Sequence, residues 1–168
     1  MRISKAFYLQ SAETAAPLLL GKLLCVRKES EVLRFKITET ECYQGEQDTA
    51  CHAHKGKTSR TEVLYREGGC AYLYLCYGIH HLLNVVTGPE GCPQAVLIRG
   101  VEGYPGPGRL TKALGITKEL NREDLCTSSR LWLEDTGAPC PPYQSGPRIG
   151  IGYADQKDQD RPWRFWIP

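Results

Sequence analysis

Two glutamates continue a segment that alternates as a β-strand does. Residues 32–43, VLRFKITETECY, place apolar side chains on one phase and polar ones on the other. If the strand continues, Glu39, Glu41 and Tyr43 fall on the apolar phase. A carboxylate on the buried side of a sheet is costly unless it is paired or used, so these glutamates are candidates for chemistry. The alternative is that the strand ends near Thr38 and that the glutamates are solvated.

Three tyrosines lie within six residues of the segment 71–86, AYLYLCYGIHHLLNVV. Two short strands with Tyr77-Gly78 at the bend predict a β-hairpin. The ring of Tyr77 would point outward at its tip, where it could slip between stacked bases and kink a duplex. Tyr74 would remain below the tip, available to stack on a flat group drawn inward. We expect Tyr72 to be an ordinary, exposed strand residue.

Basic residues gather locally, although the net charge of the chain is only +2. The whole molecule therefore lacks the strong positive field of many nucleic-acid-binding proteins. Residues 54–66 carry four cations against one acid, and a second basic cluster follows: Lys55, Lys57, Arg60, Arg66 and Glu62, then Arg109, Lys112 and Lys118. These charges are either solvated loop residues or contacts to phosphate.

The strands and helices that must position these residues are expected to form one α+β domain over residues 1–168. We expect a curved, mainly antiparallel β-sheet flanked by short helices, with the hairpin protruding from it. Further strands are expected at 94–102, 147–154 and 163–168. Short helices are expected at 11–21 with Ser11 as N-cap, from 109 to Gly115, and as one turn capped by Asn121; 44–70, 103–108 and 156–162 are expected to be loops.

Length and composition agree with one folded domain. The 168 residues suffice for a core, and no apolar run has the length of a membrane span or of a signal-peptide core. No two of the eight cysteines are three residues apart, so we interpret them as free thiols in a reducing cytosol. The chain is therefore expected to act in the cytoplasm, at the bacterial nucleoid, or in a nucleus, without secretion or membrane contact. Nothing in the sequence suggests more than a monomer.

Five co-linear blocks between Phe7 and Phe165 resemble the alkyladenine (3-methyladenine) DNA glycosylases of the mammalian type. The blocks are ITETECYQGEQDTACHA, AYLYLCYGIHHLLNVV, AVLIRGVEG, GPGRLTKALGI and PRIGIGYA. The resemblance implies a monofunctional glycosylase of base excision repair acting on double-stranded DNA that contains damaged purines. Such an enzyme flips 3-methyladenine, 7-methylguanine, hypoxanthine or ethenoadenine out of the duplex, hydrolyses the N-glycosidic bond and leaves an abasic site. Hydrolysis by activated water needs no metal and no cofactor.

The resemblance also implies roles for single residues. Glu41 matches the general base that activates water, and Arg99 an arginine that positions the lesion-bearing nucleotide and its water. Tyr43 and Tyr74 match the two rings that stack on the flipped base. The remaining matches are His52, which reads the base edge, Asn84, which crowds the amine of normal guanine, and Tyr77, which fills the gap in the duplex.

Other residues are assigned by their place in the same blocks or, for the basic cluster 55–66, by their charge. We include Cys51 in the base-binding pocket, and we assign DNA contacts to Gly78, Ile79, Lys55, Lys57 and Arg60. A few positions depart from the family pattern: Thr61 where Asn is common, Leu64-Tyr65 for Met-Phe, and His80 and His81 for Met, Tyr, Phe or Cys. These departures leave lesion preference and duplex affinity open, while the reaction is unaffected.

Three alternatives remain. A zinc site would use Cys51, His52, His54, Cys70 and Cys76, although no Cys-x-x-Cys or His-x-x-x-His pair exists. A non-catalytic nucleic-acid-binding module could share the fold. Glu41 argues against such a binder, because a buried carboxylate would repel phosphate. A glycosylase-like protein that has lost its activity is the third alternative.

Overall fold

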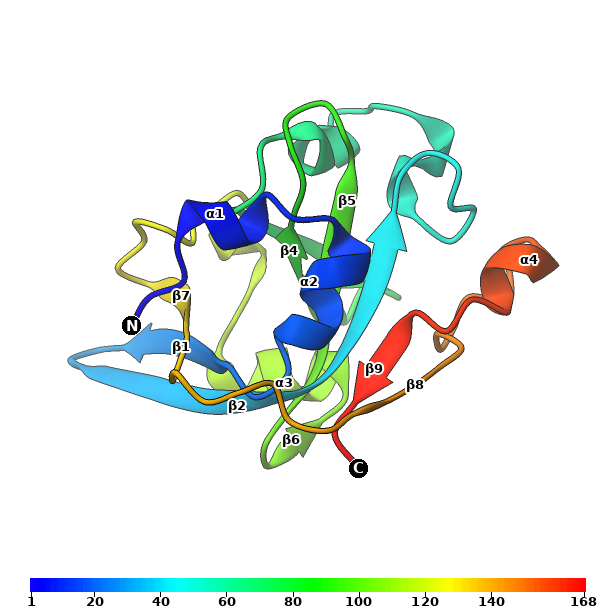
Figure 1. Ribbon diagram of the computed structural model, residues 1–168. Helices are drawn as coiled ribbons and strands as arrows, with labels where there is room; N and C mark the ends of the chain where they lie inside the picture. The colour runs from blue at the N-terminus through cyan, green and yellow to red at the C-terminus, as the bar shows by residue number, and fades with distance from the viewer.

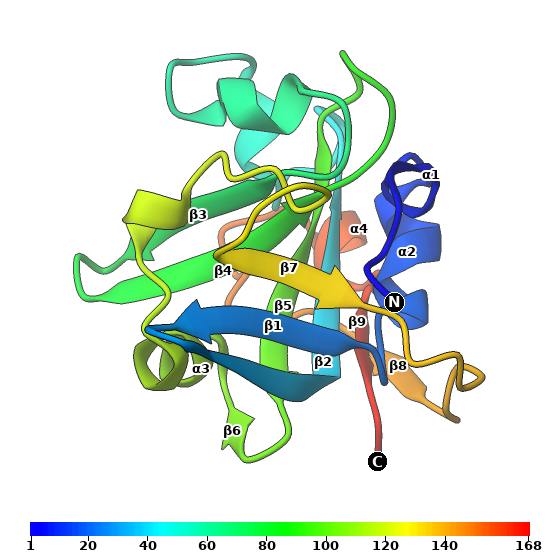
Figure 2. The same cartoon turned by 90° about the vertical axis from the view of Figure 1, so that its left-hand side faces the viewer.

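A nine-stranded, mostly antiparallel sheet curls around the core of the protein (Figures 1 and 2). The computed structural model describes all residues from 1 to 168. Six strands follow one another in the order β3-β4-β5-β2-β1-β7, β6 pairs with β5, and β9 pairs with β2 and β8. The strands are β1 (Leu23–Lys28), β2 (Glu31–Gln44), β3 (Ala71–Cys76), β4 (His80–Val86), β5 (Gln94–Val101), β6 (Tyr104–Pro105), β7 (Leu131–Glu134), β8 (Gln144–Gly146) and β9 (Arg164–Trp166). The predicted α+β class with a curved sheet is confirmed.

The central strand β2 spans 14 residues and carries the predicted carboxylates. Its first half pairs with β1 and its second half with β5 and β9, and the register shifts between Ile37 and Thr40. Thr40 donates from Oγ1 to the carbonyl of Ala16 at 2.8 Å, so Thr40 faces the helix that covers this side. Glu41 therefore faces the side of the sheet opposite Ile37 and Cys42, which belong to the main core, because the register shift reverses the alternation. The expectation that Glu39, Glu41 and Tyr43 share the phase of Ile37 is wrong, although Glu41 is buried on its own side. The alternative that the strand ends near Thr38 is wrong.

Short helices cover the sheet and close its ends. They are α1 (Lys5–Tyr8), α2 (Ala12–Leu18), α3 (Pro107–Leu114) and α4 (Gln156–Gln159), with the 3₁₀ helices η1 (His52–Lys55), η2 (Thr61–Tyr65) and η3 (Lys118–Leu120). Ser11 accepts a hydrogen bond from the Thr14 amide at 3.2 Å and caps α2 as predicted. α2 and α3 pack on the sheet, and 27 buried side chains form the main core. No helix combines the length and apolar character that crossing a membrane requires.

Several predicted elements are corrected by the structure. Residues 147–154 form no strand, and the strand that closes the sheet beside β9 is β8. The alternation there comes from Ile-Gly repeats, in which Gly150 adopts a φ of +76° outside the β region. Residues 156–162 are not simply a loop, because they contain α4, whose Asp158 is buried. Asn121 lies at the C-cap of η3 rather than at an N-cap.

Two further differences concern short elements. The segment 44–70 holds η1 and η2 rather than an irregular loop alone. The strands β1 and β7 have no counterpart in the prediction, although they extend the sheet beyond β2.

Candidate active site

The β3–β4 hairpin projects from the sheet (Figure 2), and three residues, 77–79, lie between its paired ends Cys76 and His80. Tyr77 and Gly78 are the central residues of the turn. Both have positive φ, +53° and +70°, which is the signature of a type I′ turn. The Ile79 amide donates to the Cys76 carbonyl at 3.2 Å and closes the turn. Tyr77 is 91% exposed and Ile79 is 72% exposed. The tip therefore presents two large apolar side chains to solvent, as predicted for Tyr77.

Glu41 is fully buried, and its carboxylate is held from three sides. Oε1 accepts a hydrogen bond from the Tyr43 hydroxyl at 2.7 Å, and Oε2 accepts one from the Ile149 amide at 2.7 Å. Nη1 of Arg99 lies 3.7 Å from Oε1. Burial raises the pKa of Glu41 above its ordinary value, while the Arg99 guanidinium, the Ile149 amide and the Tyr43 hydroxyl oppose the rise. Each carboxylate oxygen keeps a further lone pair that can accept a proton from water.

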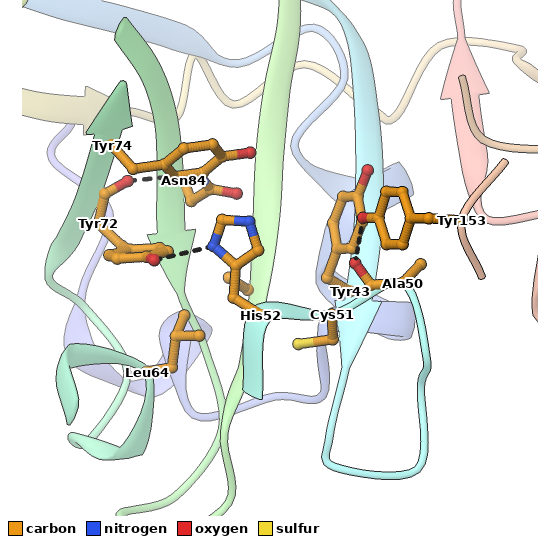
Figure 3. A pocket seen from close by; sticks show the side chains of 10 residues that line it. Tyr43, Ala50, Cys51, His52, Leu64, Tyr72, Tyr74, Asn84 and Tyr153 are labelled. Atoms are coloured by element: carbon orange, nitrogen blue, oxygen red, sulfur yellow. Dashed lines mark hydrogen bonds between the residues drawn. The ribbon is translucent and has the colours of Figure 1, made fainter. Parts of the chain in front are cut away.

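Aromatic side chains form the walls of a pocket beside Glu41. In Figure 3, Tyr74 and Tyr43 lie on opposite sides, with His52 between them. The His52 and Tyr74 rings have centroids 4.4 Å apart. Nδ1 of His52 lies 2.9 Å from the Tyr72 hydroxyl. Tyr72 is only 2% exposed, so the expectation that it is an ordinary exposed strand residue is wrong.

His52 is uncharged at neutral pH. Burial, together with the nearby Arg60 guanidinium, lowers the pKa of His52 to about 4. Arg60 itself lies over the Tyr74 ring, with its Cζ 5.3 Å from the ring centroid. Arg60 is exposed and lines neither cavity, but it lies against Tyr74, which is a wall of the pocket.

Asn84 and Cys51 complete the inner end of the pocket. Asn84 is buried and donates from Nδ2 to the Tyr72 carbonyl at 3.3 Å. The inner chamber has a volume of about 40 Å³, enough for a few water molecules. It shares Tyr43, His52, Tyr74 and Tyr153 with a wide groove of about 790 Å³, which also reaches Arg99, Tyr77, Arg109 and Lys112. The predicted pocket residues thus line one chamber, and the groove connects that chamber to the hairpin tip.

The remaining predicted DNA contacts lie outside both cavities. Lys55 and Lys57 are exposed, and Lys57 lies 5.7 Å from the centroid of the Tyr65 ring. Arg66 pairs with Glu62 at 2.9 Å, and Glu62 also lies 3.3 Å from Arg122.

The positions that depart from the family pattern support these surfaces. Leu64 lines the inner chamber, and His80 lines the groove. Thr61 is buried and donates to the Gly56 carbonyl at 3.1 Å, which orders the segment before η2. The carbonyl of His81 accepts from Thr111 at 2.6 Å and ties the hairpin to α3.

Arg148 and Asp48 form a buried ion pair that sequence reasoning missed. The guanidinium donates to both carboxylate oxygens, at 2.7 and 3.0 Å, and lies 4.9 Å from the Tyr43 ring centroid. This pair anchors the segment that supplies the Ile149 amide to Glu41. Tyr153, also missed, donates to the Ala50 carbonyl at 2.8 Å across the pocket rim (Figure 3). A charged residue inside the apolar run PRIGIGYA was the available signal for Arg148.

The candidate zinc ligands do not gather into a site. No three His, Cys, Asp or Glu side chains lie where they could hold one metal ion. All eight cysteines are free thiols.

Comparison with known proteins places the chain in a family. The sequence model described as "Methylpurine-DNA glycosylase (MPG)" matches residues 6–105 and 103–168. A protein of Myxococcus xanthus (strain DK1622), provisionally named 3-methyladenine DNA glycosylase, is 45% identical over 174 aligned residues, covering 98% of this chain and 89% of the relative. Proteins of the same provisional name from Borreliella burgdorferi (strain ZS7) and Anaeromyxobacter dehalogenans (strain 2CP-C) are 41% and 43% identical, covering 98% of this chain and 95% and 83% of the relatives.

These matches and the pocket define an enzyme of DNA repair, a DNA glycosylase that hydrolyses N-glycosyl bonds. The chain belongs to the methylpurine-DNA glycosylase family. The relatives compared are bacterial, so the mammalian type suggested by the sequence blocks stays a prediction.

Proposed function

We propose that this enzyme excises alkylated or deaminated purines from double-stranded DNA, using a water activated by Glu41. The substrates would be 3-methyladenine, 7-methylguanine, hypoxanthine and ethenoadenine, and the products a free base and an abasic site. One observation carries the proposal: a fully buried carboxylate, held by Tyr43 and Ile149, lies directly beside a pocket with aromatic walls. A protein that only binds nucleic acid has no use for that carboxylate.

Glu41 supplies the chemistry in this mechanism. Burial raises the pKa of Glu41 toward neutral pH. A general base accepts a proton from water most effectively when its pKa lies near the working pH. The negative charge also stabilises the positive charge that develops on the sugar as the glycosidic bond breaks. Arg99, 3.7 Å from Glu41 and facing the groove, positions the lesion-bearing nucleotide and its water.

The flipped base stacks on Tyr43, with the adjoining rings of His52 and Tyr74 on its other side. The inner chamber is smaller than the groove, so a purine enters from the groove side, past residues common to both cavities. Base–aromatic stacking is worth about 1–3 kcal/mol per base, and alkylation makes a purine more electron-poor and strengthens the stack. Because His52 is neutral, its ring does not repel a cationic alkylated base. Asn84, Cys51 and Leu64 bound the space available to exocyclic groups.

The hairpin opens the duplex. Tyr77 enters the stack at the position of the extruded nucleotide, and Gly78 and Ile79 contact the neighbouring bases or sugars. Phosphates lie along the groove near Arg109 and Lys112, and Lys55 and Lys57 extend the positive surface. We expect the enzyme to act as a monomer, because one chain holds the wedge and the complete pocket.

A duplex with a single hypoxanthine or ethenoadenine tests this function. The parent protein, incubated with the duplex in EDTA and then treated with alkali, should give strand breaks at the lesion only. Glu41→Gln should keep lesion binding and lower the single-turnover rate by roughly 10²–10⁴-fold. Glu102→Gln, which removes an exposed carboxylate paired with Lys36, is the matched control and should cleave as the parent does.

Other outcomes separate the alternatives. Parental cleavage by Glu41→Gln would refute water activation by this residue. Strand breaks without alkali would show an additional lyase activity. Lesion binding without any cleavage by the parent would favour the non-catalytic module or an inactive glycosylase.

A further inference from the structure

A second carboxylate lies on β2, two residues before Glu41. The side chain of Glu39 is 18% exposed and borders two arginines. Its Oε2 accepts a hydrogen bond from Nε of Arg164 at 2.5 Å and lies 3.4 Å from Nε of Arg99. Arg99 therefore stands between two carboxylates, since its Nη1 is 3.7 Å from Glu41.

Arg99 is incompletely bonded in this position. Its Nε is buried and makes no hydrogen bond, although Glu39 lies within ion-pair distance. The separation from Glu41 is also longer than a hydrogen bond. A buried donor without a partner is unfavourable, so the surrounding structure must hold Arg99 away from full pairing with either carboxylate.

Arg164 holds Glu39 from the other side. β9 pairs with β2 so that Trp166 lies opposite Glu39 and Arg164 lies opposite Glu41. The Arg164 guanidinium stacks on the Trp166 ring, 4.3 Å from its centroid, which fixes its direction toward Glu39. The sheet register therefore places Arg164 where it pairs with Glu39. This pairing weakens the attraction of Glu39 for Arg99.

We propose that Glu39 is a positioning residue that divides Arg99 between two carboxylates and so keeps an oxygen of Glu41 available to the attacking water. Arg164 acts only through Glu39, by limiting the pull of Glu39 on Arg99. The catalytic consequence rests on the proposed function, whereas the division of Arg99 is a property of the free protein.

The ionisation of Glu41 reports on this division, because Arg99 is the strongest influence that opposes the effect of burial. The other groups that face Glu41 are the hydroxyl and amide donors described above and three more distant groups: Arg148 on the 147–151 segment, Tyr74 on β3 and Tyr153 on the pocket rim. None of these forms a hydrogen bond or an ion pair with Glu39 or Arg164. A change at either residue therefore reaches Glu41 through Arg99 or through a long-range Coulomb effect.

The two routes make different predictions for a double variant. Glu39→Gln frees Arg99 to pair with Glu41, which favours the carboxylate and lowers the pKa of Glu41. Arg164→Gln frees Glu39 to draw Arg99 away, which raises the pKa of Glu41. If Arg164 acts only through Glu39, then the pKa of Glu41 in the double variant Glu39→Gln/Arg164→Gln is lowered as in Glu39→Gln alone. If the effects are independent long-range charges, they cancel and the double variant resembles the parent.

The measurement is a ¹³C NMR titration of the Glu41 side-chain carboxyl in the free protein, assigned by its loss in Glu41→Gln. Single-turnover cleavage of the hypoxanthine duplex is followed over the same pH range. We expect the acid limb to move to lower pH in Glu39→Gln and in the double variant, and to higher pH in Arg164→Gln. The plateau rate of Glu39→Gln should fall on the order of 10- to 100-fold, because a carboxylate fully paired with Arg99 accepts a proton less readily. Arg164→Lys should retain the parental acid limb, and Glu102→Gln should change neither readout.

A double variant with the parental Glu41 titration, or single variants that leave it unchanged, would overturn the proposal. The readouts also separate its failure from that of the proposed function. The predicted NMR pattern in a parent that cleaves no lesion would support the division of Arg99 and refute the proposed function. Cleavage of the lesion by the parent without the predicted NMR pattern would support the proposed function and refute the division of Arg99.

Discussion

Replacing Tyr77 with asparagine should stabilise the fold while weakening lesion capture. Tyr77 has a φ of +53°, and a left-handed conformation costs a residue with a bulky side chain roughly 1–2 kcal/mol. Asparagine tolerates that conformation and precedes glycine in the favoured type I′ turn. The ring is 91% exposed, so its removal forfeits almost no packing.

The expected gain in the free energy of unfolding is about 1 kcal/mol. For a domain of this size, such a gain raises the unfolding midpoint by about 2–4 °C. Urea and thermal unfolding of Tyr77→Asn against the parent measure it. Ile79→Asn is the matched control, because Ile79 is exposed on the same tip but does not have a positive φ; its stability should stay within about 0.5 kcal/mol of the parent.

The same variant should bind a hypoxanthine duplex more weakly, because it lacks the ring proposed to fill the gap left by an extruded nucleotide. Fluorescence anisotropy with lesion and undamaged duplexes measures this loss. A destabilised Tyr77→Asn would refute the strain argument, since it would mean that the ring makes stabilising contacts. Undiminished preference for the lesion would refute the wedge. Together the two measurements ask whether strain at the tip is kept for function rather than for folding.

Two further predictions concern buried charge and buried imidazole. Arg148→Met leaves Asp48 buried without its partner and should lower the free energy of unfolding in urea by about 3–5 kcal/mol. The double variant Arg148→Met/Asp48→Asn should recover part of this loss. A loss below about 1 kcal/mol in Arg148→Met would contradict the anchoring role. His52 has a folded-state pKa of about 4 against an ordinary 6.5, so unfolded chains bind the proton first and stability should fall as pH drops from 6.5 toward 4. In His52→Gln this part of the pH dependence should disappear, and an unchanged slope of unfolding midpoint against pH would show that other groups cause it.

The sequence predicts the elements whose patterns are local. β2, β4 and β5 are recognisable because their apolar residues alternate or run together, and the hairpin because Tyr77-Gly78 interrupts two such runs. β1 and β7 lie at one side of the sheet. Their buried residues form a continuous run and do not alternate with exposed ones. The segment 147–154 misleads because Ile-Gly repeats imitate a strand, while Gly150 turns the backbone out of the β region.

Long-range pairing explains what the sequence does not predict in the site. Tyr43, His52 and Tyr74 were located mainly by resemblance, and the structure brings them to one pocket. Glu41 lies behind Tyr43, whose hydroxyl it bonds, rather than in the lining of the pocket. Arg148 and Asp48 are 100 residues apart, and no periodicity links them. The prediction for Tyr72 was wrong for a similar reason, because its hydroxyl partner, His52, lies on a 3₁₀ helix within a segment expected to be irregular.

Charge balance explains how the fold tolerates the buried carboxylate of Glu41. Three carboxylates, on Glu39, Glu41 and Asp48, stand among three guanidiniums, on Arg99, Arg148 and Arg164. The set is neutral overall, and its members come from β2, β5, β9 and two loops, so only the folded chain assembles it. Asp48 and Arg148 are paired at hydrogen-bond distance, whereas Arg99 and Glu41 are not. The pairing is thus complete where it supports the backbone and incomplete at the carboxylate proposed to accept a proton, which is where a fully satisfied ion pair would hinder the reaction.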